Sequence, residues 1–155
     1  MGFDLDGVLV EGPPFVPSWL LELLYRGAKE KKLHYRIPGS KIEIWIRQLS
    51  HNSFFRPPIL KNIEILKQMK EHELFLVTSR YSFLQEHTHA LLKLYGIDHL
   101  FKEIVLNSKD EQPHIFKLKT LERLNLDIFI DDDEDLLTFL KEKLPNVKFV
   151  TAPSK

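Results

Sequence analysis

The sequence predicts an α/β fold in which a parallel β-sheet is covered by helices on both faces. From about residue 59 onward, short apolar runs alternate with amphipathic helical patterns, the order typical of repeated βαβ units. The apolar runs are continuous and do not alternate with polar residues, as expected for strands buried on both faces. At 155 residues, the chain is long enough for one compact domain with a small appended element.

Each element after residue 59 follows from a local pattern. Gly96 stands where a left-handed helix C-cap is expected, and Pro113 stands at a first helical position. The first strand is short, because only three residues precede Asp4, and it would be marginal unless it lies centrally with a partner on each side. Later strands are expected at 74–78, 103–106, 128–130 and 147–150, and helices at about 60–69, 82–95, 113–124 and 134–144.

A segment of different character, residues 11–56, follows the first strand, so the predicted core comprises residues 1–10 and 57–155. The second half of this insert, around residues 42–46, alternates like a strand but also fits a short helix, and periodicity leaves both open. We expect the insert to be small and mostly helical. Its first half has the spacing of an amphipathic helix, formed by Trp19, Leu20, Leu23 and Leu24.

Composition and charge argue against several classes of protein. The 22 Lys and Arg residues balance 22 Asp and Glu residues, which argues against a nucleic-acid coat or a polybasic membrane binder. The absence of cysteine removes disulfides and thiolate metal sites, so a metal would need oxygen or imidazole ligands. No apolar run approaches the roughly 20 residues that cross a bilayer. We therefore expect a cytoplasmic protein with no membrane partner and no stable nucleic-acid complex.

Polar residues follow three of the predicted strands, at the point where each strand ends. The carboxyl ends of parallel strands form one edge of a sheet, and ligands bind there. A group of carboxylates converging at that edge requires a cation, and oxygen ligands suit Mg²⁺ better than zinc. Gly7 permits the chain to turn sharply away from this edge. The three polar runs are Asp4-Leu5-Asp6-Gly7, Thr78-Ser79-Arg80 and Asp131-Asp132.

With these runs the chain resembles the haloacid dehalogenase (HAD) superfamily of phosphohydrolases, which have a Rossmann-like sheet and often a cap inserted after the first strand. The first, second and fourth motifs of that superfamily correspond to residues 3–8, 76–80 and 128–132. Its third motif is a lysine that precedes the fourth. We choose Lys117, which opens the helix leading into the acidic strand, and Lys109 and Lys119 remain candidates.

The resemblance implies a magnesium-dependent phosphomonoester hydrolase that acts through an aspartyl-phosphate. Asp4 would attack the phosphorus as a carboxylate nucleophile. Asp6 would protonate the departing alcohol and then deprotonate the water that hydrolyses the intermediate. The groups that would bind the non-bridging phosphate oxygens are Thr78, Ser79 and Lys117.

The resemblance also implies the ligands of the metal. Mg²⁺ would be held by Asp4, by the backbone carbonyl of Asp6 and by Asp131, with Asp132 in support. Asp135 is a further candidate, because the acidic run 131–135 contains two variants of the fourth motif.

The insert is expected to act as a small cap that selects a small phosphorylated substrate. Aromatic rings beside an arginine suit a nucleobase or a sugar, although the same rings could form the core of the cap itself. Loose similarity to deoxyribonucleotidase-like proteins around residues 55–59 favours a nucleotide. The alternatives are a phosphotransferase, a polynucleotide-end phosphatase and a HAD-like binding module without turnover. The candidate specificity residues are Trp45, Phe55 and Arg56, with Tyr35 and Phe54 beside them.

Overall fold

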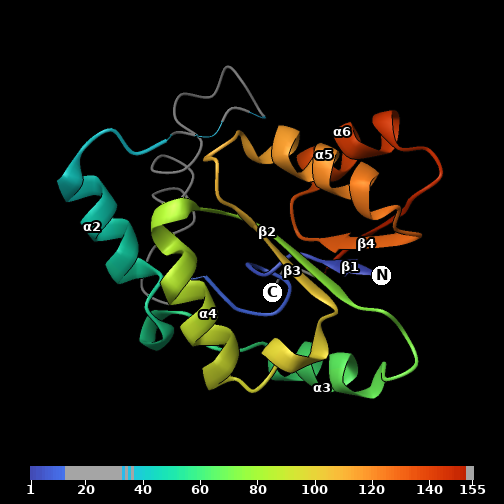
Figure 1. Ribbon diagram of the computed structural model, residues 1–155, viewed down its shortest axis with the longest axis horizontal. Coiled ribbons are helices and arrows are strands. Elements are labelled where there is room, and N and C mark those ends of the chain that lie inside the picture. Colours follow the sequence, from blue (N-terminus) through green and yellow to red (C-terminus); the bar gives the residue numbers. More distant parts are fainter. Residues whose placement is uncertain (13–32, 34, 36, 153–155) are drawn as a thin grey trace.

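Five parallel strands form the central sheet of the computed structural model, which describes residues 1–12, 33, 35 and 37–152 (Figure 1). Their spatial order is β3-β2-β1-β4-β5. The predicted parallel α/β fold is therefore confirmed. The strands are β1 (Gly2–Phe3), β2 (Phe75–Tyr81), β3 (Glu103–Asn107), β4 (Ile128–Asp131) and β5 (Lys148–Thr151).

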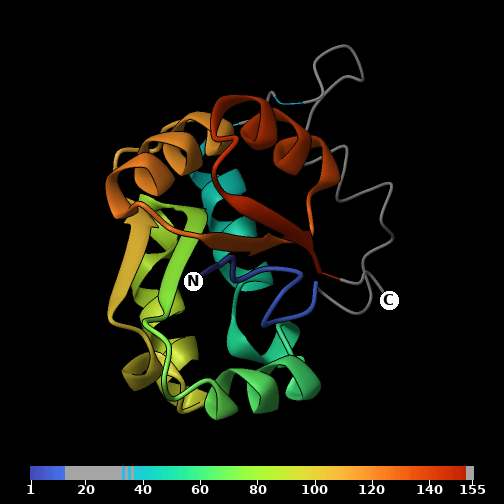
Figure 2. The ribbon, with the colours of Figure 1, turned by 90° about the vertical axis from the view of Figure 1, so that its right-hand side faces the viewer.

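The helices cover both faces of the sheet (Figure 2). Helices α3 (Leu60–Gln68) and α4 (Gln85–Leu94) contribute to one apolar cluster, which contains Ile63, Leu91 and Leu92. Helices α5 (Pro113–Leu124) and α6 (Glu134–Lys143) contribute to the other, which contains Phe116, Leu137 and Phe129. The central strands β1 and β2 are thus buried between two helical layers, as continuous apolar strands predict, whereas the edge strand β5 is largely exposed.

The short first strand lies in the centre of the sheet. Gly2 pairs with Phe75 of β2 on one side and with Phe129 of β4 on the other. A Cβ atom at Gly2 would lie 2.5 Å from the Leu126 side chain and 2.9 Å from the Phe129 side chain, so glycine permits the close approach of β4 and the segment before it to β1. The short strand therefore has the central position and the two partners that its length requires.

The local signals at element ends also agree with the structure. Gly96 follows α4 with a φ of 61°, and Pro113 is the first residue of α5. Two details differ from the sequence expectations. The helix expected from residue 82 begins as a short 3₁₀ turn, Ser82–Leu84, before α4. Strand β2 continues to Tyr81, because a shift in register lets Tyr81 pair with Asn107 of β3.

The second half of the insert is helical. Helix α2 (Lys41–Ser50) begins at the N-cap Ser40, whose hydroxyl accepts a hydrogen bond from the Glu43 amide at 3.2 Å. The 3₁₀ turn Ser53–Phe55 follows α2. The helix expected on Trp19, Leu20, Leu23 and Leu24 lies outside the described residues.

Hydrogen bonds join the described part of the insert to the core. The Gln48 side chain donates to the Phe83 carbonyl at 3.1 Å, and the Tyr95 hydroxyl donates to the Arg56 carbonyl at 2.7 Å. These contacts hold α2 beside the carboxyl end of β2. In the described ranges, none of the helices has both the length and the apolar character needed to span a bilayer.

Candidate active site

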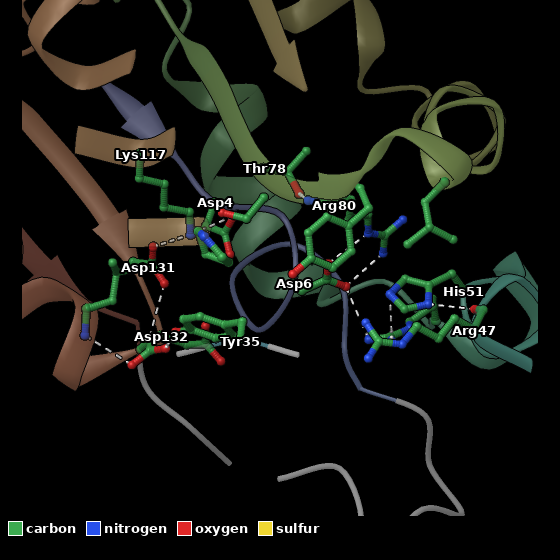
Figure 3. Close-up of a pocket in the computed structure, with 17 residues that line it drawn as sticks. Asp4, Asp6, Tyr35, Arg47, His51, Thr78, Arg80, Lys117, Asp131 and Asp132 are labelled. Carbon is green, nitrogen blue, oxygen red and sulfur yellow. Dashed lines mark hydrogen bonds and ion pairs between the residues drawn. The ribbon is translucent and has the colours of Figure 1, made fainter. Parts of the chain in front are cut away.

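A cavity of about 310 Å³ opens at the carboxyl ends of β1, β2 and β4. Side chains that follow these strands line it together with residues of α5 and of the insert (Figure 3). The parallel topology explains this position, because the last residues of neighbouring strands meet at one edge. Three sequence-distant polar runs therefore converge, as the sequence predicts. The lining includes Asp4, Asp6, Thr78, Ser79, Lys117, Asp131 and Asp132.

Three carboxylates form the acidic end of the cavity. Asp4, Asp131 and Asp132 each offer an oxygen within 4.8 Å of the others. The Lys117 ammonium lies between two of them, 2.6 Å from Asp131 Oδ2 and 3.1 Å from Asp4 Oδ1. Of the three candidate lysines, the structure places Lys117 beside these carboxylates, whereas Lys109 is exposed and Lys119 pairs with Glu111 at the surface.

Burial and neighbouring charges shift the pKa values of the ionisable side chains at the acidic end of the cavity. Burial raises the pKa of Asp4 well above its usual range, and the neighbouring Asp131 adds to the rise against the opposing pull of Lys117. Burial and Asp131 likewise raise the pKa of Asp132 to about 7. Burial disfavours the charge of Lys117, but Asp131 and Asp4 outweigh it and raise the lysine's pKa above its ordinary value.

The residues at the acidic end fit a hard divalent cation. Asp4 Oδ1 is buried and has no hydrogen bond of good geometry in the described structure, although Lys117 lies near it. One ammonium against three closely spaced carboxylates leaves negative charge that a cation would balance. Carboxylate oxygens are ligands typical of Mg²⁺. The Asp135 and Asp6 side chains are not part of this cluster.

The turn after Asp6 is shaped to admit Asp132. Gly7 has a φ of 74°, in the left-handed region that glycine adopts without strain. A Cβ atom at this position would lie 2.0 Å from the Asp132 carboxylate. Glycine is therefore needed here both for the turn and for the close approach of Asp132 to the first polar run.

Two arginines bind Asp6 at the other end of the cavity. Arg80 donates from Nε to Asp6 Oδ2 and from Nη2 to Asp6 Oδ1, both at 2.7 Å, and Arg56 Nη1 donates to Oδ1 at 3.2 Å. Burial disfavours the charged form of Asp6, but Arg80 and then Arg56 outweigh burial and hold its pKa well below the usual range. Asp6 is therefore an ionised carboxylate in this arrangement.

His51 positions Arg56. Its Nδ1 lies 2.8 Å from the Arg47 carbonyl, which can only accept, so Nδ1 carries the proton. The opposite nitrogen, Nε2, then accepts from Arg56 Nη2 at 3.2 Å, and Arg56 Nε donates to the Ser50 carbonyl at 3.0 Å. Burial, with Arg56 and Arg80, lowers the pKa of His51 to about 3, so this imidazole stays neutral.

The end of β2 supplies hydroxyl groups to the cavity. Thr78 is buried, and its hydroxyl oxygen accepts a hydrogen bond from the Arg80 amide at 3.4 Å. The Ser79 and Tyr81 hydroxyl oxygens are buried and make no hydrogen bond within the described structure. Both residues line the cavity.

The candidate specificity residues of the insert divide into two groups. Arg56 and Tyr35 line the cavity, and the Tyr35 hydroxyl donates to Asp133. Trp45, Phe54 and Phe55 are not among the cavity-lining residues, and the side chain of Trp45 is largely exposed. The structure therefore does not bring Trp45 and Phe55 to the cavity.

Three residues near Asp6 were not anticipated as parts of the site. Arg47 and His51 lie one helical turn apart at the end of α2, and both are buried at the cavity with Tyr81. The four-residue spacing of Arg47 and His51 was the available sequence signal, because it places both on one helix face. Nothing in the sequence indicated that this face would meet β2.

Comparisons with known proteins give likenesses of structure. No family model and no curated protein matches the sequence. A chain of the Pnkp1/Rnl/Hen1 RNA repair complex is 15% identical with a TM-score of 0.60, and the match covers 97% of this chain and 40% of that one. A HAD family enzyme of Bacteroides thetaiotaomicron, solved as an alanine mutant with magnesium and inorganic phosphate, is 16% identical with a TM-score of 0.56 and coverages of 99% and 93%.

The same likeness extends to a haloacid dehalogenase-like hydrolase of Streptococcus pneumoniae, which is 16% identical with a TM-score of 0.56. That match covers 97% of this chain and 82% of the other. The fold is that of the HAD hydrolases. This chain spans less than half of the length of the RNA repair chain that it resembles.

Proposed function

We propose that this HAD-like chain is a magnesium-dependent phosphomonoester hydrolase that forms an aspartyl-phosphate on Asp4. The observation that supports the proposal most is the group of three carboxylates with Lys117 at the carboxyl edge of the sheet. It combines a nucleophile, oxygen ligands for a cation and a buried ammonium that can bind phosphate oxygens.

In the first step, a carboxylate oxygen of Asp4 attacks the phosphorus while the bond from phosphorus to the leaving oxygen breaks. Asp4, Asp131 and Asp132 would hold Mg²⁺, which would reduce the repulsion between the nucleophile and the phosphate. Lys117, Thr78 and the Ser79 hydroxyl would bind the non-bridging oxygens. The unsatisfied oxygen of Ser79 is consistent with this role.

In the second step, water attacks the aspartyl-phosphate and gives up a proton. Asp6 is ionised by its arginine partners, which is the form that accepts this proton. The leaving alcohol of the first step requires a proton, so donation from Asp6 would require Arg56 and Arg80 to loosen their contacts with it. We therefore expect the arginine contacts to change when substrate binds.

The substrate that we propose is a small phosphorylated metabolite such as a nucleotide, in a cytoplasmic protein whose residues 11–56 form a cap. Arg56 and Tyr35 support a role of the insert in recognition, because both line the cavity. A second candidate is a phosphatase that acts on polynucleotide ends. The likeness to a chain of an RNA repair complex favours this candidate.

Release of phosphate from an aryl phosphate tests the reaction. We expect turnover with Mg²⁺, loss of turnover with a chelator, and a decrease of at least about a thousandfold in Asp4→Asn. Absence of magnesium-dependent turnover in the wild-type protein would contradict the proposal. A nucleotide and a 3′-phosphorylated oligonucleotide, compared at equal concentration, distinguish the two substrate classes.

A further inference from the structure

The end of the cavity that faces the insert carries an arginine wall, which we define as Arg47, Arg56, Arg80 and Tyr81. Each of these side chains lines the cavity, and each residue is at most 6% exposed. Arg80 and Arg56 share the single carboxylate of Asp6. This end of the cavity is therefore basic, whereas the end at Asp131 is acidic.

Tyr81 supplies an independent observation. Its hydroxyl oxygen is buried and has no hydrogen-bond partner in the described structure. Burial raises the pKa of Tyr81, and the Arg47 guanidinium opposes this rise, so the phenol lies within the field of a guanidinium group. A buried hydroxyl is normally satisfied, and one that lines a cavity can be satisfied by a ligand.

The chemistry of the wall favours an oxyanion. Guanidinium groups present N–H donors in a planar fork that matches phosphate and carboxylate oxygens, and a phenol hydroxyl can add a further donor. Arg56 makes one hydrogen bond through each of Nε, Nη1 and Nη2, and each of its two Nη atoms carries a second N–H group. A cavity of about 310 Å³ is in the size range of small-molecule sites and accommodates more than a phosphate group.

We propose that the arginine wall is a subsite for a second anionic group of the substrate, while the phosphate to be hydrolysed lies at Asp4 and Lys117. The substrate is then a small molecule with two anionic groups, the second being a phosphate or a carboxylate. This assignment rests on the proposed function for the position of the first phosphate.

Calorimetry with the Asp4→Asn variant and Mg²⁺ tests the subsite without requiring turnover. One pair of probes is adenosine 3′-monophosphate and adenosine 3′,5′-bisphosphate, which differ by a phosphate. The other pair is glycerol 3-phosphate and 3-phosphoglycerate, which differ by a carboxylate. We expect the second anion to increase affinity by about tenfold or more in at least one pair, as for a charge-assisted hydrogen bond. The pair that responds identifies the group.

Variants of the arginine wall then test whether this wall is the source of the gain in affinity. In the Asp4→Asn background, Tyr81→Phe and Arg47→Gln should each reduce the gain in affinity at least about threefold, whereas the surface variant Arg123→Gln should preserve it. Tyr81→Phe keeps the shape of the buried ring, so its result stands even if Arg47→Gln does not fold. The subsite is refuted if neither pair shows a gain, if the two-anion probes do not bind, or if the gain persists in Tyr81→Phe.

Hydrolysis of an aryl phosphate by the wild-type protein separates the two proposals. An aryl phosphate has no second anion, so its turnover depends on the acidic end of the cavity. Turnover without a gain in the calorimetric pairs would refute the subsite and support the hydrolase. A gain without turnover would support the anion subsite and contradict the hydrolase.

Discussion

Asp4 and Asp6 are the same residue type and lie two positions apart at the same cavity, yet their surroundings shift their pKa values in opposite directions. Burial and neighbouring acids raise the pKa of Asp4, whereas two guanidinium groups overcome burial and lower the pKa of Asp6. The difference arises from elements distant in sequence, with Asp131 on one side and Arg56 and Arg80 on the other. Pairs of acids with such opposed environments are typical of sites that divide nucleophilic and proton-transfer roles.

The acidic end and the basic end of the cavity also differ in the balance of their charged side chains. The acidic end has an excess of carboxylates around one lysine, so a cation would stabilise it. The basic end has three guanidinium groups, two of which bind the Asp6 carboxylate, and His51 helps to position one of them, Arg56. We therefore expect perturbations of the acidic end to depend on magnesium and those of the basic end to depend on pH.

Lys117→Met should produce the largest effect. It removes the ammonium between Asp4 and Asp131, and breaking a buried ion pair typically costs about 3 to 5 kcal/mol of unfolding free energy. Urea denaturation with and without Mg²⁺ measures the loss, which we expect the cation to restore in part. The control Lys119→Met removes an exposed pair and should cost less than about 1 kcal/mol. Equal losses in the two variants would contradict the role of Lys117.

His51→Gln should remove a pH dependence. The folded pKa of His51 is about 3, below the unfolded value of 6.5, so its contribution to stability is present above pH 6.5 and is lost as the pH falls toward 3. Between pH 8 and pH 5, the wild-type protein should lose about 2 kcal/mol relative to His51→Gln. Urea denaturation of both proteins at each pH gives this difference, in which the titration of other groups cancels. Parallel pH profiles would show that folding does not lower the pKa of His51.

Gly7→Ala should weaken the acidic end by a smaller amount. The left-handed backbone would cost about 1 to 2 kcal/mol with a side chain present, and the new Cβ would displace the Asp132 carboxylate. We expect a several-fold weaker affinity for Mg²⁺, measured by calorimetric titration. Gly39→Ala is the matched control, because its Cβ would meet no atom within 4 Å. Similar magnesium affinities in the two variants would argue against Asp132 as a ligand.

Trp45→Ala should have the smallest effect. Trp45 is 60% exposed and does not line the cavity, so we expect kcat/KM for an aryl phosphate to change less than about threefold. Arg56→Gln, which weakens the contact with Asp6, should decrease the same quantity at least about tenfold. A larger decrease for Trp45→Ala than for Arg56→Gln would restore Trp45 as a specificity residue.

The sequence was sufficient for the fold because its signals are local. Continuous apolar strands, Gly96 after α4 and Pro113 at the start of α5 each specify an element without knowledge of its neighbours. The sequence also contained a signal for helix α2, since Ser40 and Glu43 have the spacing of a capping box. The alternating pattern of residues 42–46 left the prediction open, because it fits a strand as well as a helix.

The acidic end could be anticipated from the sequence, whereas the basic end could be anticipated only in part, through Arg56 and Arg80. Asp4 and Asp131 follow strands, so the parallel topology alone brings them to one edge. Arg56 binds Asp6 from the insert and is itself held by His51, and the placement of this segment depends on contacts such as that of Gln48 with the Phe83 carbonyl. Likewise, the aromatic character of Trp45 indicated a ligand contact, but the helix turns this ring toward solvent.

The central position of β1 has a consequence for folding. Gly2 and Phe3 pair with Phe75 and Leu76 of β2 and with Phe129 and Ile130 of β4, so this strand forms only contacts of long sequence separation. Such contacts are made slowly, because long loops must close before any pairing can compensate for the lost entropy. The helices can form early, whereas Asp4 meets Asp131 only when the two halves of the sheet join. Under the proposed function, magnesium affinity should therefore appear during refolding only after β1 and β4 have paired.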